Sequence, residues 1–242
     1  MTRIKRPRQL VSAAVAASLP VLLAACNENF PNSTFQRTTD INRDLIGLWN
    51  QLMWWGIAVF VIVEAILLYA MVKYRRRPDS PEPKHVHGNT VLEISWTLLP
   101  AVILAIIAVP TVRAIWRYEG QPPASSLQVE VIGHQWWWEF RYPQYNVTTA
   151  NELYLPIGRT VNFSLRTADV IHSFWIPGLS GKRDAISNRT NYLWFTPDSV
   201  PPSAWVGSCN EYCGASHANM RFRAFTVAPA DFETWEIGRA HV

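Results

Sequence analysis

Residues 56–72 read GIAVFVIVEAILLYAMV, an apolar run that a single charged residue, Glu64, interrupts. Three tryptophans precede the run, and the basic stretch KYRRR follows it at residues 73–77. A helix of this length crosses the hydrocarbon layer of a bilayer, and aromatic residues at one end with basic residues at the other indicate the outer and the cytoplasmic interface. We therefore predict a transmembrane helix over residues 45–74. Because a carboxylate is costly in hydrocarbon, Glu64 should face protein or water.

A second apolar segment at residues 91–118 predicts a second transmembrane helix. Its two prolines, Pro100 and Pro110, are compatible with this prediction because membrane helices tolerate proline. The loop between the helices, residues 75–90, carries more Lys and Arg than Asp and Glu, which places it in the cytoplasm and both chain ends outside. Two histidines of this loop are expected to be solvated: His85 and His87.

The chain begins with a basic segment, an apolar run from Leu10 to Leu23 and small residues before Cys26. This pattern predicts a signal peptide of the lipoprotein type over residues 1–25, with Cys26 as the lipid-modified first residue after cleavage. An uncleaved membrane anchor with an incidental cysteine is the alternative. Residues 26–44 would form an outer N-terminal segment. Residues 236–242 are expected to be a non-native tail, since EIGRAHV matches a translated sequencing adapter.

After a linker at residues 119–126, short runs with strand character alternate with turns over residues 127–235. Such spacing predicts an all-β domain, an antiparallel sandwich or barrel. The chain has 242 residues, is 49% hydrophobic and carries a net charge of +4. Residues 121–235 hold eight Lys and Arg against nine Asp and Glu, a net charge of −1, so we expect no strong electrostatic steering of a charged partner.

The densest chemical signal is CNEYCGASHANM at residues 209–220, which places two thiols, an imidazole and a thioether within one short stretch. Sulfur ligands favour copper over hard cations, and imidazole suits copper as well as zinc. A second imidazole, His172, lies upstream in DVIHSF at residues 169–174. For an exported chain, a disulfide between Cys209 and Cys213 is one alternative and a zinc site is another. Neither alternative requires a methionine at this spacing.

The pattern C-x-E-x-C-x-x-x-H-x-x-M, preceded by D-V-x-H-S-F, resembles the binuclear copper (CuA) site of subunit II of the haem–copper cytochrome c oxidases. The resemblance implies a cupredoxin-like barrel that holds copper on loops and strand ends at one rim. In this family the two cysteines bridge the coppers, each histidine binds one copper, and a methionine and a main-chain carbonyl are weak ligands. The implied metal ligands are His172, Cys209, Glu211 through its carbonyl, Cys213, His217 and Met220.

The resemblance implies three further roles, two of which have a plainer alternative. Within GHQWWWEF (residues 133–140), Trp136 corresponds to the surface tryptophan at which electrons enter from cytochrome c. The two tryptophans after it are expected to serve packing, and in one continuous strand the middle tryptophan would face away from the other two. The Glu211 carboxylate is implied in a Mg²⁺ site shared with subunit I, and a solvated loop carboxylate is the alternative. Glu93 corresponds to the acid at the mouth of a proton channel, and a helix-terminal acid favoured by the helix dipole is the alternative.

Residues 181–189 resemble the family segment that packs on subunit I. Ser187-Asn188 stands where the family usually has Pro-Gly, so we expect a different turn there. The candidates for contact with subunit I are Arg183, Asp184 and Arg189.

These features imply subunit II of a bacterial respiratory cytochrome c oxidase, which passes electrons from cytochrome c through the copper pair to haem in subunit I, where oxygen is reduced and protons are pumped. The implied partners are the other oxidase subunits, the lipid bilayer, and cytochrome c in a soluble, membrane-bound or fused form; no nucleic-acid partner is expected. The implied location is the bacterial plasma membrane, with the copper domain on the periplasmic side. Two alternatives are a quinol oxidase subunit II, which lacks copper, and a membrane-tethered copper-binding or electron-carrier protein. The complete ligand set argues against the first, and the two spans with Glu93 argue against the second.

Overall fold

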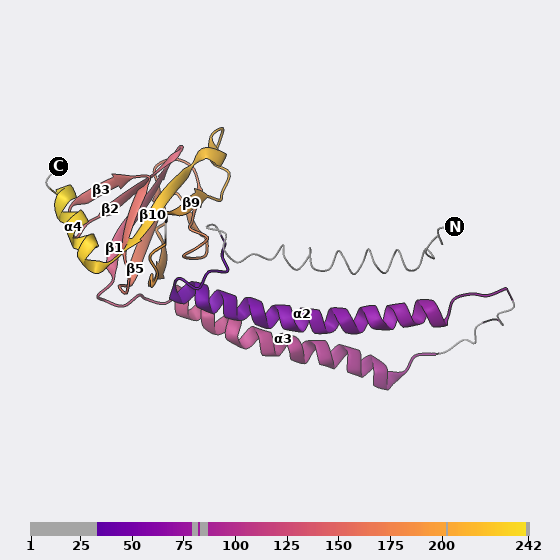
Figure 1. Ribbon diagram of the computed structural model, residues 1–242. Coiled ribbons are helices and arrows are strands. Elements are labelled where there is room, and N and C mark those ends of the chain that lie inside the picture. Colours follow the sequence, from indigo (N-terminus) through magenta and orange to yellow (C-terminus); the bar gives the residue numbers. More distant parts are fainter. Residues whose placement is uncertain (1–32, 79–81, 83–86, 202, 241–242) are drawn as a thin grey trace, which may run out of the picture.

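The computed structural model describes residues 33–78, 82, 87–201 and 203–240, in which two long helices carry a β-sandwich at one end (Figure 1). The predicted signal peptide, Cys26 and His85 lie outside the described residues. The elements in chain order are α2 (Asp40–Lys73), α3 (Thr90–Glu119), β1 (Leu127–His134), β2 (Trp137–Tyr142), β3 (Val147–Ala150), β4 (Glu152–Pro156), β5 (Val161–Thr167), β6 (His172–Trp175), β7 (Arg183–Ala185), β8 (Asn191–Phe195), β9 (Trp205–Cys209), the 3-10 helix η1 (His217–Asn219), β10 (Arg221–Val227) and α4 (Pro229–Ala240).

Helices α2 and α3 are the two helices that the apolar runs predict. Each contains a segment with a mean hydropathy of 2.3, none of which is buried inside the protein. Side-chain caps fix where the helices start: Thr39 accepts the N–H of Asn42 at 3.1 Å, and Asn89 accepts the N–H groups of Val91 and Leu92. The chain therefore forms a helical hairpin whose apolar surface is left for lipid or for other proteins.

The outer end of α2 is embedded in the sandwich. The helix begins at Asp40, before residue 45 where the apolar pattern starts, because its first turn is held by the sandwich rather than by lipid. Ile41 is buried, and the hydroxyl of Thr39 donates to the carbonyl of Leu179 at 2.7 Å. Hydropathy alone does not detect such contacts.

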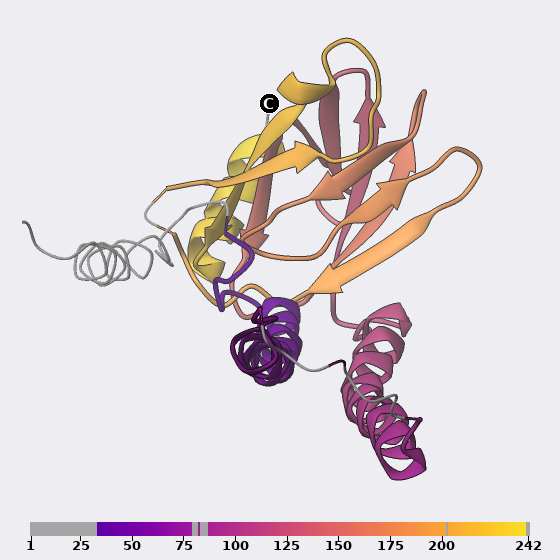
Figure 2. The same ribbon diagram turned by 90° about the vertical axis from the view of Figure 1, so that its right-hand side faces the viewer.

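The outer end of α3 is fixed in a similar way. Arg117 and Tyr118 both contact the carboxylate of Asp44 in α2, at 2.9 and 2.7 Å. The last residue of the helix, Glu119, pairs with Arg183 of β7 at 2.7 Å. Polar contacts from both helices thus orient the sandwich relative to the hairpin, and Figure 2 shows it standing on their outer ends.

The outer domain consists of two five-stranded sheets, ordered β3-β2-β1-β5-β8 and β4-β10-β9-β6-β7. Most neighbouring strands are antiparallel, but β1 pairs with β5 and β4 pairs with β10 in parallel. The predicted antiparallel arrangement is wrong at these two pairs. Apolar–polar alternation identifies the two faces of a strand but carries no information about the direction of the strand beside it.

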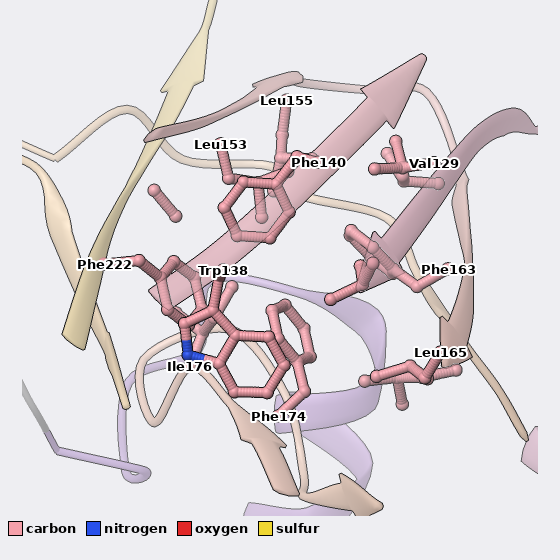
Figure 3. Packing of buried hydrophobic residues seen from close by; sticks show 14 of the residues in the cluster. Val129, Trp138, Phe140, Leu153, Leu155, Phe163, Leu165, Phe174, Ile176 and Phe222 are labelled. Carbon is pink, nitrogen blue, oxygen red and sulfur yellow. The ribbon is translucent and has the colours of Figure 1, made fainter. Parts of the chain in front are cut away.

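Aromatic side chains fill the space between the two sheets (Figure 3). Trp138 and Phe140 of β2 meet Phe174 of β6 and Phe222 of β10, with edge-on or tilted contacts whose ring centroids are 5.2–6.3 Å apart. Such arrangements are favourable because the positive edge of one ring meets the negative face of another. The expectation that Trp138 serves packing is confirmed by its complete burial.

The last helix, α4, was not expected from the sequence. It packs on β3 and β4, where Phe232 is buried and Trp235 stacks on Tyr154 with a centroid distance of 4.5 Å. Residues 236–240 continue this helix, and their assignment to a non-native tail stays a prediction.

Candidate metal centre

The predicted ligands come from two adjacent strands and the loop that follows one of them. His172 is the first residue of β6, and Cys209 is the last residue of β9, which pairs with β6. The chain then turns through the loop and η1 to Met220, directly before β10. The N–H of Cys209 donates to the carbonyl of Met220 at 3.0 Å. This hydrogen bond closes the loop, so that residues eleven positions apart lie side by side.

The side chains of the loop and of His172 converge on one buried cluster. The sulfur atoms of Cys209 and Cys213 are 3.8 Å apart. The Nδ1 atom of His172 lies 3.7 Å from the first sulfur, and that of His217 lies 3.5 Å from the second. Met220 Sδ is 3.7 Å from Cys213 Sγ. The cluster is arranged as two sulfurs at its centre with one imidazole beside each.

These distances fit metal ligation and exclude a disulfide. A disulfide requires sulfur atoms about 2.05 Å apart, whereas Cys209 and Cys213 are free. Metal bonds of about 2.3 Å to sulfur and 2.0 Å to nitrogen in a tetrahedral arrangement separate the two donor atoms by about 3.5 Å. The buried thioether of Met220 favours copper over zinc, because the usual zinc ligands are cysteine, histidine and carboxylates. The cluster is therefore suited to copper.

The main-chain carbonyl of Glu211 completes the predicted set, because its oxygen lies 3.3 Å from Cys209 Sγ. The residue itself is exposed, so its carboxylate is free to contact solvent or another chain. Glu93 lies in the first turn of α3, at the end of the hairpin far from the sandwich (Figure 1). The structure thus brings six predicted residues together and leaves Glu93 apart from them.

Burial and mutual contacts set the protonation of the metal-free cluster. Burial opposes ionisation of both thiols, but at Cys209 the hydrogen bonds, led by the one with His172, together outweigh it and lower the pKa. At Cys213, burial and the negative charge of the neighbouring sulfur raise the pKa. A negative charge is therefore favoured on Cys209, and the second thiol should release its proton when a metal binds.

Asp169 orients His172, a role that the sequence did not reveal. Its carboxylate lies 2.8 Å from Nε2 of His172, which is fully buried, and accepts the N–H of Gln135 at 2.7 Å. Although burial of the imidazole works against its charged form, the contacts with Cys209 and Asp169 raise its pKa. A carboxylate behind a ligating histidine fixes the orientation of its ring. The sequence signal that could have predicted this contact is the D-x-x-H spacing of Asp169 and His172.

Trp136 lies directly beside the cluster. Its Nε1 donates to the carbonyl of Cys213 at 3.2 Å, and the Gln135 side chain donates to the same oxygen at 2.6 Å. The indole remains 38% exposed. The single continuous strand considered for the three tryptophans is not formed, because Trp136 lies in the turn before β2. That turn places one indole between the cluster and the surface.

Gly133 of β1 is a second residue whose role the sequence did not reveal. A methyl group at its Cα would lie 2.6 Å from Cδ2 and 2.9 Å from Cγ of His172. Real Cβ atoms do not approach other atoms so closely. Only glycine fits at this position while the imidazole keeps its place.

The turn at Ser187-Asn188 has an unusual backbone conformation at its second residue. Asn188 has a φ of 60°, in the left-handed region that favours glycine. Asparagine is the side chain that adopts this region most readily after glycine. Asn188 can therefore hold a backbone conformation that glycine adopts freely, and the expected difference from the family's turn stays a prediction.

Two family models match separate parts of the chain. A family model described as the transmembrane domain of cytochrome c oxidase subunit II matches residues 28–114, and one described as the periplasmic domain of the same subunit matches residues 146–227. The two apolar helices and these matches show a membrane protein with an outer domain.

Several curated relatives are similar to this chain. Cytochrome c oxidase subunit 2 of Alkalihalophilus pseudofirmus is 39% identical over 74% of this chain and 54% of the relative, and that of Bacillus subtilis is 34% identical over 90% and 65%. The chain thus spans between about half and two thirds of their length. A probable cytochrome c oxidase subunit 2 of Rickettsia bellii is 31% identical over 76% of this chain and 75% of its own. Quinol oxidase subunit 2 of Bacillus cereus is 28% identical over 73% of this chain and 62% of the relative.

Among solved structures, the periplasmic domain of subunit II of cytochrome oxidase from Bradyrhizobium japonicum is 27% identical. It covers 50% of this chain and 98% of that domain, with a TM-score of 0.47.

Proposed function

The chain belongs to the family of cytochrome c oxidase subunit II, and from that premise we propose that it is the electron-accepting subunit of a bacterial respiratory oxidase. It takes electrons from cytochrome c at a binuclear CuA centre and passes them to haem in subunit I, where oxygen is reduced and protons are pumped. It resides in the plasma membrane with the copper domain on the periplasmic side. The observation that carries this proposal is the convergence of two cysteines, two histidines and a methionine in one cluster.

The residues of this cluster have different roles as copper ligands. Cys209 and Cys213 lie at its centre, where both sulfurs can contact the same ions, and His172 and His217 lie on either side. The weak ligands are the Sδ atom of Met220 and the carbonyl of Glu211. A copper pair bound there would accept and release one electron at a time.

The surrounding chain keeps these ligands fixed. His172 and Met220 are fully buried, and Cys213 is 3% exposed. Asp169 holds the ring of His172, and the hydrogen bond from the N–H of Cys209 to the carbonyl of Met220 closes the loop. Ligands that cannot move need little reorganisation when the charge changes, and this favours rapid electron transfer.

Trp136 is proposed as the point at which electrons enter. Its indole is partly exposed, so a docked donor can reach it, and its Nε1 is hydrogen-bonded to the carbonyl of Cys213, a proposed bridging ligand. One side chain thus connects the surface with the backbone of the metal site.

Glu211 and β7 are proposed to face subunit I. The Glu211 carboxylate is exposed while the carbonyl of the same residue points at Cys209, so one residue can serve both copper and a shared Mg²⁺. Arg183 and Asp184 lie on the edge strand β7, and Arg189 follows the Asn188 turn.

Glu93 is proposed to collect protons at the cytoplasmic side. Its carboxylate folds back toward the start of α3, where a methyl group built on Gly88 would lie 2.3 Å from Oε1. This position at the first turn keeps the carboxylate near water and near the positive end of the helix dipole.

The test is the electron paramagnetic resonance spectrum of the full chain in detergent after loading with copper. We expect seven hyperfine lines from one electron shared by two coppers. The variant His87→Ala should show the same spectrum, because His87 lies in the cytoplasmic loop. A four-line mononuclear spectrum would favour a membrane-tethered copper carrier, and the absence of bound copper would favour a subunit of the quinol oxidase type.

A further inference from the structure

We propose that Gln135 is a positioning residue that connects the two sides of the candidate metal centre. One side is His172 at the start of β6, and the other is Cys213 in the loop after β9. Gln135 lies in the turn that joins β1 to β2. The consequence for electron transfer rests on the proposed function, whereas the contacts themselves are testable without metal.

The main chain of Gln135 supports the His172 side. Its N–H donates to Oδ2 of Asp169 at 2.7 Å, while Oδ1 of the same carboxylate lies 2.8 Å from Nε2 of His172. Both carboxylate oxygens are thus engaged, so the carboxylate cannot rotate without losing one of these contacts. Because a carboxylate behind a ligating histidine fixes its ring, a shift of Gln135 is transmitted to the imidazole.

The side chain of Gln135 supports the Cys213 side. Its Nε2 donates to the carbonyl of Cys213 at 2.6 Å, and Nε1 of Trp136 donates to the same oxygen at 3.2 Å. A methyl group built on Gly214 would lie 3.0 Å from Nε2 of Gln135, so the amide rests directly on the loop. Two donors on one carbonyl restrain the peptide group that follows Cys213.

These contacts form a closed circle around the sulfur atoms, which we call the contact circle. It runs from His172 through Asp169 to Gln135. From Gln135 it continues to Cys213, and the sulfur of Cys209 closes it, 3.8 Å from Cys213 Sγ and 3.7 Å from Nδ1 of His172. Fixing both sides of the centre relative to each other favours even sharing of an electron and reduces the rearrangement when the charge changes.

The first experiment measures amide hydrogen exchange in the metal-free full chain in detergent. The reporters are the N–H groups of Cys209 and Met220, which donate to carbonyls of the same loop. Gln135→Leu should raise their exchange rates about three- to tenfold, because one hydrogen bond that restrains the loop is lost. The matched control is Gln144→Leu, which should leave both rates unchanged, since Gln144 lies beyond the other end of β2.

Gln135→Glu separates hydrogen bonding from space filling. It keeps the shape of the side chain, but at neutral pH a carboxylate oxygen would replace the N–H donor and face the carbonyl oxygen of Cys213. Gln135→Glu should therefore raise the exchange rates at least as much as Gln135→Leu. Parent rates in Gln135→Glu would show that the side chain only fills space, and this result would overturn the proposal.

A double-mutant cycle tests the connection between the two sides. Asp169→Asn leaves one acceptor oxygen where the carboxylate offers two, so it opens the contact circle on the His172 side. If Gln135 connects the sides, the effects of Gln135→Leu and Asp169→Asn on the exchange rates should deviate from additivity by about threefold or more. Additive effects would refute the connection.

The copper-loaded protein provides the functional readout. Gln135→Leu should retain bound copper, but its electron paramagnetic resonance spectrum should show broadened, unequal hyperfine lines in place of seven even ones. A spectrum identical to that of the parent would refute a role in electron sharing. If the parent itself lacks the seven-line spectrum while exchange still depends on Gln135, the copper function alone is contradicted.

Discussion

Gly133→Ala tests whether close packing against His172 controls the metal centre. The added methyl group would lie 2.6 Å from Cδ2 of the imidazole, whereas ordinary contacts begin at 3.4 Å. The ring must therefore retreat by about 0.8 Å, or β1 must shift by a similar amount. The ring has little space, because Trp138 lies behind it with a centroid distance of 5.8 Å and Asp169 holds Nε2.

The expected effect is large for copper and moderate for stability. Metal sites tolerate deviations of about 0.2 Å in ligand distance, so a displaced Nδ1 should lower copper affinity by about 10- to 100-fold, as loss of an orienting contact does. Overpacking should lower the free energy of unfolding of the metal-free protein by about 1–3 kcal/mol. Copper affinity is measured on the full chain in detergent by competition with a chelator, and unfolding is followed by circular dichroism.

The matched control is Gly181→Ala, because nothing lies within 4 Å of a methyl group at that position. It should bind copper like the parent protein. If Gly133→Ala binds copper with the parent affinity and spectrum, then either the ring is free to move or His172 is not a ligand, and the reasoning from close packing fails.

Three further predictions concern other sites. Trp136→Phe keeps an aromatic ring but loses the hydrogen-bond donor to the carbonyl of Cys213. Copper content should be unchanged, whereas electron uptake from reduced cytochrome c, measured by stopped-flow, should slow by about tenfold, which corresponds to ~1.4 kcal/mol in the activation free energy. An unchanged rate would show that electrons do not enter through Trp136. Glu93→Ala should slow oxygen consumption of the whole oxidase with copper content intact, and unchanged turnover would end the proton-uptake proposal. Burial of Glu139 opposes its ionisation, but its contacts, led by the hydrogen bond from Arg141, outweigh burial and hold the pKa below its ordinary value of 4.5. The ionised carboxylate therefore stabilises the folded protein above pH 4.5, and this stability is lost as the pH falls through the lowered pKa. Glu139→Gln should therefore flatten the fall in melting temperature in this acidic range, and an equally steep fall would contradict the assignment.

The sequence was sufficient to predict the helical hairpin and the β domain, because both depend on local patterns. Apolar runs of sufficient length predict a transmembrane span, and the residue types at positions 209–220 predict a metal site. The groups that hold the motif in place are far from it in sequence. Gly133 and Asp169 act through contacts with His172, and only the pairing of strands brings Gly133 close to it.

The parallel strand pairs and α4 were missed for related reasons. Strand direction depends on the path of the connecting chain, which alternation does not encode. Phe232 and Trp235 of α4 are spaced three apart, yet the segment is short and its stability comes from packing on Tyr154 and its neighbours.

The contacts at the outer end of α2 also set an order of events during synthesis. Thr39 and its partner Leu179 are 140 residues apart, and Asp40 accepts an N–H from Thr196, 156 residues further along. At a synthesis rate of about 5–20 residues per second, the first helix exists for roughly 7–30 s before these partners are made. His217 and Met220 follow later still. For the proposed copper site, loading is therefore expected to be a late step, which begins only after both spans have been synthesised and the loop of residues 209–220 has crossed the membrane.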